Sequence, residues 1–450
     1  MSLHTFDAQT LSSLYRRREL SPREVIHNIL GRIDGLQERF NAYRVVDAEG
    51  ALHQAAASEA RWLRGTPLSE LDGIPVALKD LLHVRGLPTR KGSLASPDHA
   101  QHKDAPVAAR LREAGAVLLG KTQTAEFGWS SLTETALGGI TRNPWNADHV
   151  CGGSSGGAAV AAALGLAPLQ VGTDGGGSIR VPAAACGVFG FKPSYGRVAG
   201  WPAAHNGTLF HIGPLTRSVG DAALLLNAIA ADDVRDWTSL PTERRDWRAG
   251  LGDGVRGLRI AYSPNLGFAD VDPAIARIVE KAARHFEDLG AFVEDADSGL
   301  ADPRHILDRL AAERAVRLRR DIDPERFELI DERIRAAVIR AEAYTLADVI
   351  DANDARADLA VRMRRFHERF DLLLTPVLSQ PVPRLGTPID SLLAAPFNLT
   401  QQPAASVPCG FDVHGLPVAL QIIGPQHRDD LVLRAARAFE SSQPFARLDV

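Results

Sequence analysis

The chain has 450 residues, of which 45% are hydrophobic and 24% charged, a composition that is ordinary for a folded protein with a hydrophobic core. Its formal net charge is −4 at pH 7, and Lys and Arg are spread along the chain. This balance gives no sign of a nucleic-acid-binding or anionic-membrane surface.

The cysteines are few and lack metal-binding spacing. Cys151, Cys186 and Cys409 form no CxxC pair, which argues against a disulfide framework and a structural zinc site and fits a reducing compartment. The first residues, MSLHTFDAQT, lack the regions of a signal peptide, and no window holds 18 uninterrupted apolar residues. We therefore expect a cytoplasmic protein without a metal or cofactor.

Helix and strand signals alternate along the chain. Ser21 and Glu24 form a capping box with Pro22 at the first helical position, and Asp104 is expected to cap a later helix. Helices are expected at about 21–33, 47–64, 104–114, 156–167, 272–289 and 429–440. Buried strands are expected at 74–78, 116–120, 169–174, 370–378 and 416–423. This alternation predicts an α/β fold.

No linker divides the chain, so we expect one domain over residues 1–450. Its core is expected at about 65–235 and 371–450. The segment from about 302 to 370 reads as charged, arginine-rich helix, and it is the best candidate for an insertion or cap over that core.

The stretch TDGGGSIR, Thr173 to Arg180, sets three glycines before a serine. Glycine lets the backbone approach a ligand closely, so the N–H groups of such a turn can converge on one point and form an oxyanion hole. Ser178 would then stand at the rim of the hole. A plain glycine-rich turn with a surface serine is the alternative interpretation.

A second glycine cluster, CGGSSGGAAVAAAL, offers Ser154 and Ser155 at the start of a helix. Taken alone, it also fits an anion-binding loop for phosphate. It lacks the GK[ST] of a P-loop, and no GxGxxG fingerprint accompanies it, so nucleotide binding has weak support.

A serine nucleophile needs a base, and Lys79 is the strongest candidate. It follows an apolar strand, where desolvation disfavours the ammonium form. Lowering a lysine pKa from about 10.4 to roughly 7 takes ~4.6 kcal/mol, which a buried strand end can supply. A lysine that extends to the surface is the alternative. Among the histidines, His205 and His211 lie in a loop-rich stretch that could line a pocket, although a structural or surface role fits them better.

Three segments of the chain form a recognisable set, namely GIPVALKD, GGITRNPWNADHVCGGSSGGAAVAAAL and VGTDGGGSIRVPAAACGVFGFKPSYGRV. Together they resemble the amidase signature family of serine hydrolases, and FNLTQQPAASVPCGFDVHGLPVALQIIG extends the resemblance over most of the chain. It implies one α/β domain whose mostly parallel or mixed central sheet is covered by helices on both faces. It also implies a Ser-Ser-Lys triad, with Lys79 as base, Ser154 as the middle serine after a cis peptide bond, and Ser178 as nucleophile.

The resemblance further assigns the surroundings of the triad. The oxyanion hole would be formed by the backbone N–H groups of Gly175, Gly176, Gly177 and Ser178. Ser155 and Thr173 are expected to hold the loops by hydrogen bonds, and Asp174 with Arg180 to anchor them electrostatically. Family members often carry a threonine or a larger residue where this chain has Gly175, so the turn loses a side chain that would stiffen it.

The segment EFGWSSLTE aligns with a family stretch that lines the substrate channel. Gly128 and Trp129 are therefore expected to bind substrate, and an aromatic wall beside a glycine suits an apolar or aryl group. Trp201 and Phe210 are further candidates for this wall. Packing in the core is the alternative for all these aromatic residues.

Three functions are open at this point. The favoured one is a stand-alone amidase that acts on small or aryl amides, with carbamates (urethanes) and esters accessible to the same acyl-enzyme chemistry. The second is the glutaminase subunit of a tRNA-dependent amidotransferase, which needs a partner chain to use the ammonia. The third is a nucleotide- or anion-binding protein. For the favoured function we expect a monomer or homodimer that binds a small amide or carbamate as its substrate.

Overall fold

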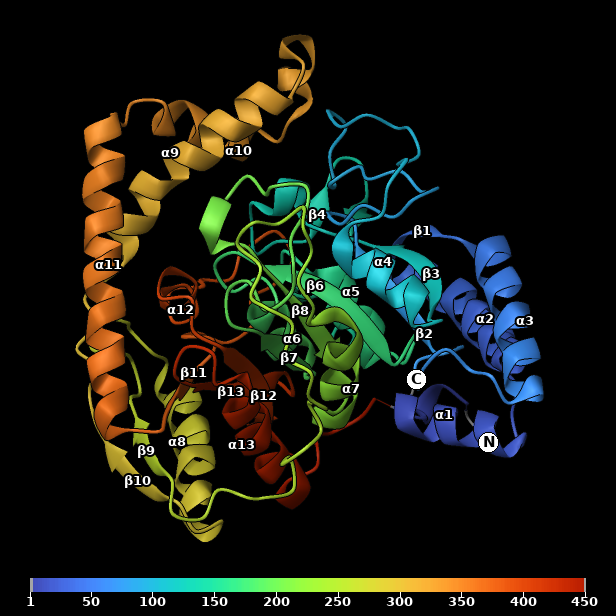
Figure 1. Ribbon diagram of the computed structural model, residues 1–450. Coiled ribbons are helices and arrows are strands. Elements are labelled where there is room, and N and C mark those ends of the chain that lie inside the picture. The colour runs from blue at the N-terminus through green and yellow to red at the C-terminus, as the bar shows by residue number, and fades with distance from the viewer. Residues whose placement is uncertain (1–2, 449–450) are drawn as a thin grey trace.

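A mixed sheet of eleven strands runs through the molecule, which a computed structural model describes for residues 3–448 (Figure 1). In spatial order its strands are β1 (Tyr43–Val46), β3 (Val117–Thr122), β2 (Pro75–Lys79), β6 (Leu169–Asp174), β8 (His211–Thr216), β7 (Phe189–Lys192), β12 (Ala404–Phe411), β13 (Pro417–Ile423), β11 (Leu372–Pro376), β9 (Arg259–Tyr262) and β10 (Phe292–Asp295). The blocks β3-β2-β6 and β11-β9-β10 are parallel, and the other neighbours are antiparallel. A separate hairpin pairs β4 (Glu134–Thr135) with β5 (Gly139–Ile140).

Helices flank this sheet, which confirms the predicted α/β fold. They are α1 (Ala8–Arg17), α2 (Pro22–Phe40), α3 (Ala48–Arg64), α4 (Pro106–Glu113), α5 (Gly156–Ala163), α6 (Arg180–Cys186), α7 (Val219–Ile229), α8 (Pro273–Asp288), α9 (Arg304–Asp321), α10 (Glu332–Ala341), α11 (Leu346–Arg369), α12 (Pro396–Leu399) and α13 (Asp429–Ser442). Short 3-10 turns are η1 (Leu3–Thr5), η2 (Glu126–Gly128), η3 (Gly207–Leu209) and η4 (Pro324–Leu329). All residues of the central strands β2, β3, β6, β8, β11 and β13 are buried, because helices cover the apolar side chains of the sheet.

The pairing of two parallel strands positions the two glycine-rich loops at the same edge of the sheet. β2 and β6 are neighbours, with Val76 beside Leu169 and Leu78 beside Val171. The carboxyl ends of parallel neighbours meet at the same edge of a sheet, which is where α/β proteins bind ligands. Lys79, at the end of β2, therefore comes close to Thr173 near the end of β6.

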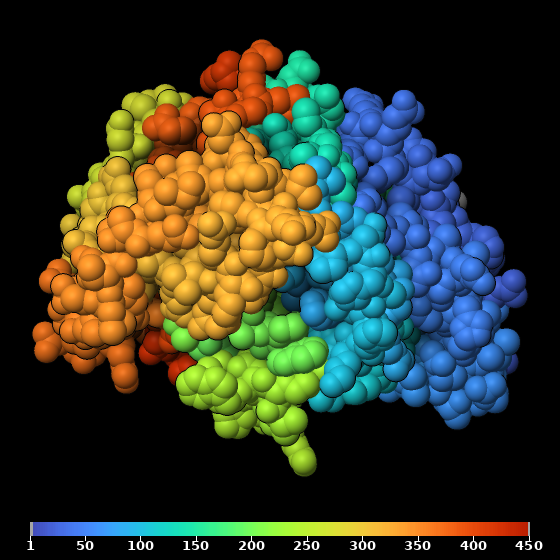
Figure 2. Space-filling view, turned by 90° about the horizontal axis from the view of Figure 1, so that it is seen from above, coloured from blue at the N-terminus to red at the C-terminus, as the bar shows by residue number. Residues whose placement is uncertain are grey.

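The charged segment 302–370 is largely helical, as predicted, and contains α9, α10 and α11. Apolar residues of this segment form their own cluster, which also includes Ala95 and Phe127 from the N-terminal half. Arg326 donates to the Leu94 carbonyl at 2.6 Å across the same contact. Figure 2 shows this orange segment meeting cyan and green parts of the chain around a hollow. The division of the chain into core and cap stays a prediction.

Two local expectations need correction. Helix α2 continues beyond Ile33 to Phe40, because the apolar stripe of Ile29, Ile33, Leu36 and Phe40 keeps helical spacing. Helix α4 has Ala105 as its N-cap without a side-chain bond. The Asp104 carboxylate instead accepts from the Arg85 N–H at 2.7 Å and from Arg112 Nε at 3.0 Å, so it ties the loop at Arg85 to helix α4.

None of the helices within residues 3–448 combines the length and the apolar character that crossing a bilayer requires. Over the same residues, no three His, Cys, Asp or Glu side chains lie together as metal ligands would.

Candidate active site

The Lys79 amine is enclosed at the end of β2, with 0% of the residue exposed. Its Nζ lies 2.6 Å from Ser154 Oγ and 2.9 Å from Thr173 Oγ1, and the Thr173 carbonyl lies at 3.5 Å. Among residues 3–448, no carboxylate is in hydrogen-bonding contact with this amine. The partners of Lys79 are therefore hydroxyl and carbonyl groups only.

Burial lowers the pKa of Lys79 well below its ordinary value, because an enclosed ammonium loses its hydration. The negative charge of Asp174 opposes this effect, and the positive charge of Arg314 adds to it. A neutral amine at this position carries a lone pair that can accept a proton from a neighbouring hydroxyl.

The loop before α5 brings the two serines of GGSSGG to the ends of β2 and β6. The peptide bond between Gly153 and Ser154 is cis, as the resemblance implied. Ser155 Oγ donates to the Thr173 carbonyl at 3.0 Å and accepts from the Thr173 N–H at 3.2 Å. The Ser155 N–H donates to the Ser178 carbonyl at 3.2 Å. Ser155 thus ties β6 to the glycine turn.

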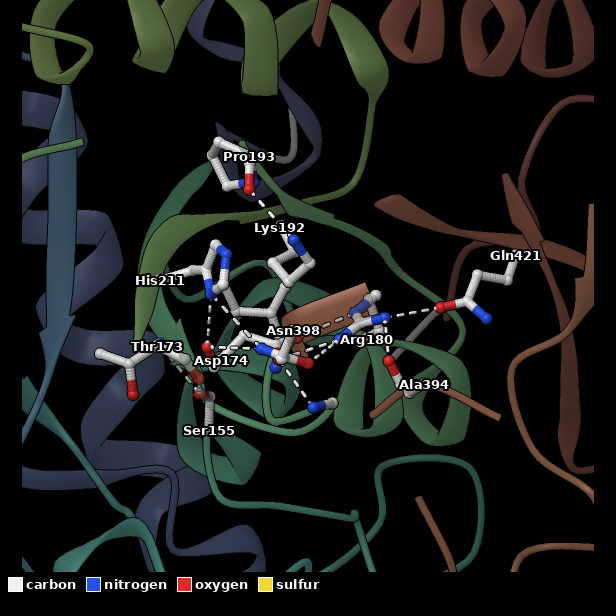
Figure 3. A network of polar contacts seen from close by, with 12 residues as sticks. Ser155, Thr173, Asp174, Arg180, Lys192, Pro193, His211, Ala394, Asn398 and Gln421 are labelled. Atoms are coloured by element: carbon white, nitrogen blue, oxygen red, sulfur yellow. Dashed lines mark hydrogen bonds and ion pairs between the residues drawn. The ribbon is translucent and has the colours of Figure 1, made fainter. Parts of the chain in front are cut away.

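Asp174 is the centre of a buried polar network that holds this turn (Figure 3). Its carboxylate accepts from Arg180 Nε and from a terminal guanidinium nitrogen of Arg180, both at 3.0 Å. It also accepts from the N–H groups of Gly177 at 2.6 Å and Ile179 at 3.1 Å. Burial alone would raise the pKa of Asp174, but the Arg180 guanidinium and nearby donors hold that pKa well below its usual range.

Arg180 connects the turn to the C-terminal third of the chain. It donates to the Ala394 carbonyl and to Gln421 Oε1, both at 2.7 Å, and to Asn398 Oδ1 at 2.6 Å. Asn398 Nδ2 in turn donates to the Asp174 carboxylate at 2.9 Å. The electrostatic anchor that the sequence expected between Asp174 and Arg180 is present and fully buried.

The turn leaves three backbone donors free beside Ser178. The N–H groups of Gly175, Gly176 and Ser178 have no acceptor within residues 3–448, whereas the Gly177 N–H donates to Asp174. This contact corrects the expected set of oxyanion donors, because the Gly177 N–H is already satisfied. Ser178 itself is partly exposed, and its Oγ makes no hydrogen bond in the part of the chain that the structure describes.

Different constraints act on the glycines of the turn. Gly177 has a φ of 116°, a backbone conformation that side chains rarely adopt. At Gly175 a Cβ would lie 1.7 Å from Asn206 Nδ2, whereas at Gly176 it would meet no atom within 4 Å. The Asn206 side chain therefore fills the space that a larger residue at position 175 would take.

Two adjoining hollows open onto this turn. They share Gly128, Gly175, Ser178, Asn206 and Arg314. The first hollow also reaches Ser154 and Thr173 and has an aromatic wall of Phe127, Trp201 and Phe210. The second is lined by Trp129, Leu307 and Leu310, among others. The predicted pocket residues Gly128 and Trp129 thus lie at the cavity, and Ser178 stands where its two halves meet.

The two candidate histidines lie near the cavity but bond to neither Ser154 nor Ser178 within residues 3–448. His205 lines the first hollow, and its Nε2 lies 3.1 Å from an Asp321 oxygen. Burial and nearby cations lower the pKa of His205 to about 4. His211 is buried in the Asp174 network, with Nδ1 2.8 Å from the Leu209 carbonyl.

Asn206, Arg314 and Asn398 belong to the site although the sequence did not single them out. Asn398 lies 224 residues from Asp174, and only its place in the motif FNLTQQPAAS gave a signal. Asn206 and Arg314 come from a loop and from an arginine-rich helix, where nothing in the local pattern separates a cavity residue from a solvated one.

Comparison with known proteins places the chain in a family. A model of the amidase family matches residues 24–433. A glutamyl-tRNA(Gln) amidotransferase subunit of Moorella thermoacetica is 37% identical, covering 99% of this chain and 98% of that protein. An acylamidase of Rhodococcus erythropolis is 35% identical, covering 99% of this chain and 97% of that protein.

Solved structures agree with these matches. The crystal structure of a bacterial aryl acylamidase of the amidase signature family superposes with a TM-score of 0.93 and 33% identity, covering 99% of this chain and 98% of that one. Fold and sequence together define a hydrolase of mixed α/β architecture that acts on carbon–nitrogen bonds. The chain belongs to the amidase signature family.

The contact between Gly175 and Asn206 generates a stability prediction. Gly175→Ala places a Cβ where Asn206 Nδ2 lies, so the end of the Asn206 side chain must move aside, and we expect the free energy of unfolding to fall by about 1 kcal/mol. Gly176→Ala is the matched control, because its Cβ has room. In chemical denaturation, the penalty of Gly175→Ala should shrink in an Asn206→Gly background. An equal penalty in both backgrounds would contradict this packing.

Proposed function

We propose that this amidase hydrolyses small or aryl amides through an acyl-enzyme intermediate on Ser178. The observation that carries the proposal is the contact of 2.6 Å between the buried Lys79 amine and the Ser154 hydroxyl, beside the cavity that Ser178 lines. Lys79 acts as the base, Ser154 relays the proton, and Ser178 is the nucleophile.

Acylation begins when neutral Lys79 takes the proton of Ser154 while Ser154 takes the proton of Ser178. The Ser178 Oγ attacks the amide carbonyl carbon, and negative charge develops on the carbonyl oxygen. The free N–H groups of Gly175, Gly176 and Ser178 are the proposed donors to that oxygen. The proton then returns through Ser154 to the leaving nitrogen, the carbon–nitrogen bond breaks and the amine departs.

Deacylation repeats the same steps with water as the attacking group. Lys79 takes a proton from the water through Ser154, the hydroxide attacks the Ser178 ester, and Ser178 regains its proton as the acid leaves. Because the intermediate is an ester of Ser178, carbamates and esters are chemically accessible substrates as well. We propose Ser155, Thr173, Asp174 and Arg180 as the residues that hold the loops in place during both steps.

The aromatic wall supports aryl amides as substrates. Phe127, Trp201 and Phe210 line one hollow and Trp129 the other, so a flat aryl group finds apolar contacts on either side of Ser178. The acylamidase and aryl acylamidase relatives support the same substrate class.

A second candidate function is the glutaminase activity of an amidotransferase subunit, which the relative from Moorella thermoacetica favours. The two functions differ in the substrates of the isolated chain. We expect the purified chain to release aniline from simple anilides and to release no ammonia from glutamine. Ammonia release from glutamine without any anilide hydrolysis would favour the second function instead.

The nucleophile is tested by covalent labelling. Ser178→Ala should lower amide turnover at least about a thousandfold and abolish labelling by a fluorophosphonate, because the attacking oxygen is gone. Ser130→Ala is the matched control, since Ser130 lines the same cavity. Mass spectrometry of the labelled chain provides the measurement, and a label that survives Ser178→Ala would refute the assignment.

The protonation state of Lys79 predicts two pH dependences. Since only the neutral amine acts as a base, kcat/KM should rise with pH through the lowered pKa of Lys79 and then level off. Between that pKa and about 10.4, the unfolded chain binds a proton at Lys79 that the folded chain does not bind. The free energy of unfolding therefore rises with pH over this range, because the cost of burying Lys79 becomes smaller.

Lys79→Met should therefore abolish turnover, and its stability gain over the natural chain should shrink as pH rises toward about 10.4. Denaturant unfolding at several pH values measures this difference. Lys103→Met, at an exposed position outside the cavity, is the control and should retain activity. A stability difference that does not change with pH would show that Lys79 is charged in the folded chain.

A further inference from the structure

Arg314 of α9 brings a cation to the cavity and forms no ion pair with any of the residues 3–448. A terminal guanidinium nitrogen donates to the Phe127 carbonyl at 3.2 Å, and the guanidinium carbon lies 4.0 Å from the centre of the Trp129 ring. Its Nε is buried without an acceptor. By contrast, Arg317, one turn further along the same helix, pairs with Glu313 at 2.7 Å.

Lys91 adds a second positive charge to the first hollow. Its amine has neither a hydrogen bond nor an ion pair within residues 3–448, and the nearby acidic charges that act on it are those of Asp321 and Asp80. The side chains that line the two hollows include no Asp or Glu of that range. His83 and His205 also line the first hollow, and burial together with the Lys91 charge lowers the pKa of each to about 4, so both are neutral at pH 7.

The cavity is therefore positively charged beside the nucleophile. Burial lowers the pKa of Arg314 to about 9, which leaves the guanidinium charged at pH 7. An unpaired cation in a partly desolvated site attracts an anion more strongly than it would in open water. The Trp129 ring covers one face of the guanidinium, and one terminal nitrogen bonds the Phe127 carbonyl. The other terminal nitrogen has no acceptor within residues 3–448, so its N–H groups can donate to an anion.

We propose that the amide substrate carries a carboxylate and that Arg314 binds this group as a specificity-determining residue. The proposal rests on the proposed amidase function and names its substrate class. A guanidinium edge matches a carboxylate with two parallel hydrogen bonds. Arg314 lines both hollows together with Ser178, so it can reach a carboxylate on either side of the scissile bond. Leu307, Leu310 and Ala311 share its helix face and give the rest of the substrate an apolar surface.

The same lining disfavours a zwitterion such as free glutamine. Its α-carboxylate has a partner in Arg314, but its α-ammonium would face two cations without an acidic partner among the described lining residues. Desolvating an ammonium without an acceptor is costly. An amide with a net negative charge satisfies the site better.

Two pairs of anilides that differ in charge test the proposal. Succinanilate carries a carboxylate on the acyl side, and butyranilide is its neutral partner with the same leaving group. The second pair is 4-acetamidobenzoate and 4-acetamidobenzamide, which differ on the leaving-group side. Release of the aromatic amine gives kcat/KM for each. We expect the anionic member of at least one pair to be preferred by about tenfold or more.

Variants at position 314 test whether Arg314 causes the preference for the anionic substrate. Arg314→Met should remove it through a higher KM for the anionic member, and Arg314→Lys should restore part of it. The charge of Arg314 also affects Lys79, but that effect acts on both members of a pair and cancels in their ratio. Arg317→Met, on the same helix, should keep the full preference.

The outcomes separate the two proposals. Equal kcat/KM within both pairs, or a preference that survives Arg314→Met, overturns carboxylate recognition while neutral anilide hydrolysis still upholds the amidase function. If no anilide of either charge is cleaved, the amidase function fails. If Arg314→Met is no longer labelled by a fluorophosphonate, its active site is disrupted, and the proposal is then tested by inhibition of the natural chain. Competitive inhibition by benzoate but not by benzamide then supports the proposal, and equal inhibition overturns it.

Discussion

The contact between an enclosed amine and a hydroxyl is the interaction on which the rest of the account depends. Lys79 has no exposed surface, and its nearest partner is Ser154 Oγ at 2.6 Å. In water an amine holds its proton firmly, and desolvation without a contacting acid, to which the charge of Arg314 adds, lowers the Lys79 pKa so that the amine can accept a proton. The fold provides this environment by ending a fully buried parallel strand at Lys79. The functional proposal stands on that burial.

A second buried network keeps the serine loops in register with this amine. Asp174 and Arg180 pair inside the protein, where isolated charges would be costly, and the backbone N–H groups and Asn398 satisfy the remaining acceptors. One of these bonds takes the Gly177 N–H out of the proposed oxyanion hole. The network thereby decides which amides of the glycine turn stay free beside Ser178. A polar network that binds no substrate shapes the proposed catalytic geometry.

The sequence predicted the parts of this structure that local chemistry determines. The apolar runs became β2, β6, β11 and β13, and the capping box of Ser21 starts α2. The family resemblance predicted that Lys79 and Ser154 lie together, and the two side chains are in contact. The expected end of α2 was wrong because the apolar stripe continues to Phe40. The expected Asp104 cap was wrong because its carboxylate bonds the Arg85 N–H and the Arg112 side chain instead of an N–H at the start of α4. Asn206 and Arg314 reach the cavity through tertiary packing that no local pattern encodes.

The charge state of Lys79 can be observed directly by NMR on a chain with ¹³C-labelled lysine. Ser178→Ala removes the proposed nucleophile but keeps the amine and Ser154, and comparison with Lys79→Met assigns the signal. We predict that Lys79 is neutral at pH 7 and gains its proton only at lower pH. A Lys79 signal that titrates near the ordinary lysine value of about 10.4 would contradict the account, because an ammonium cannot take the proton of Ser154.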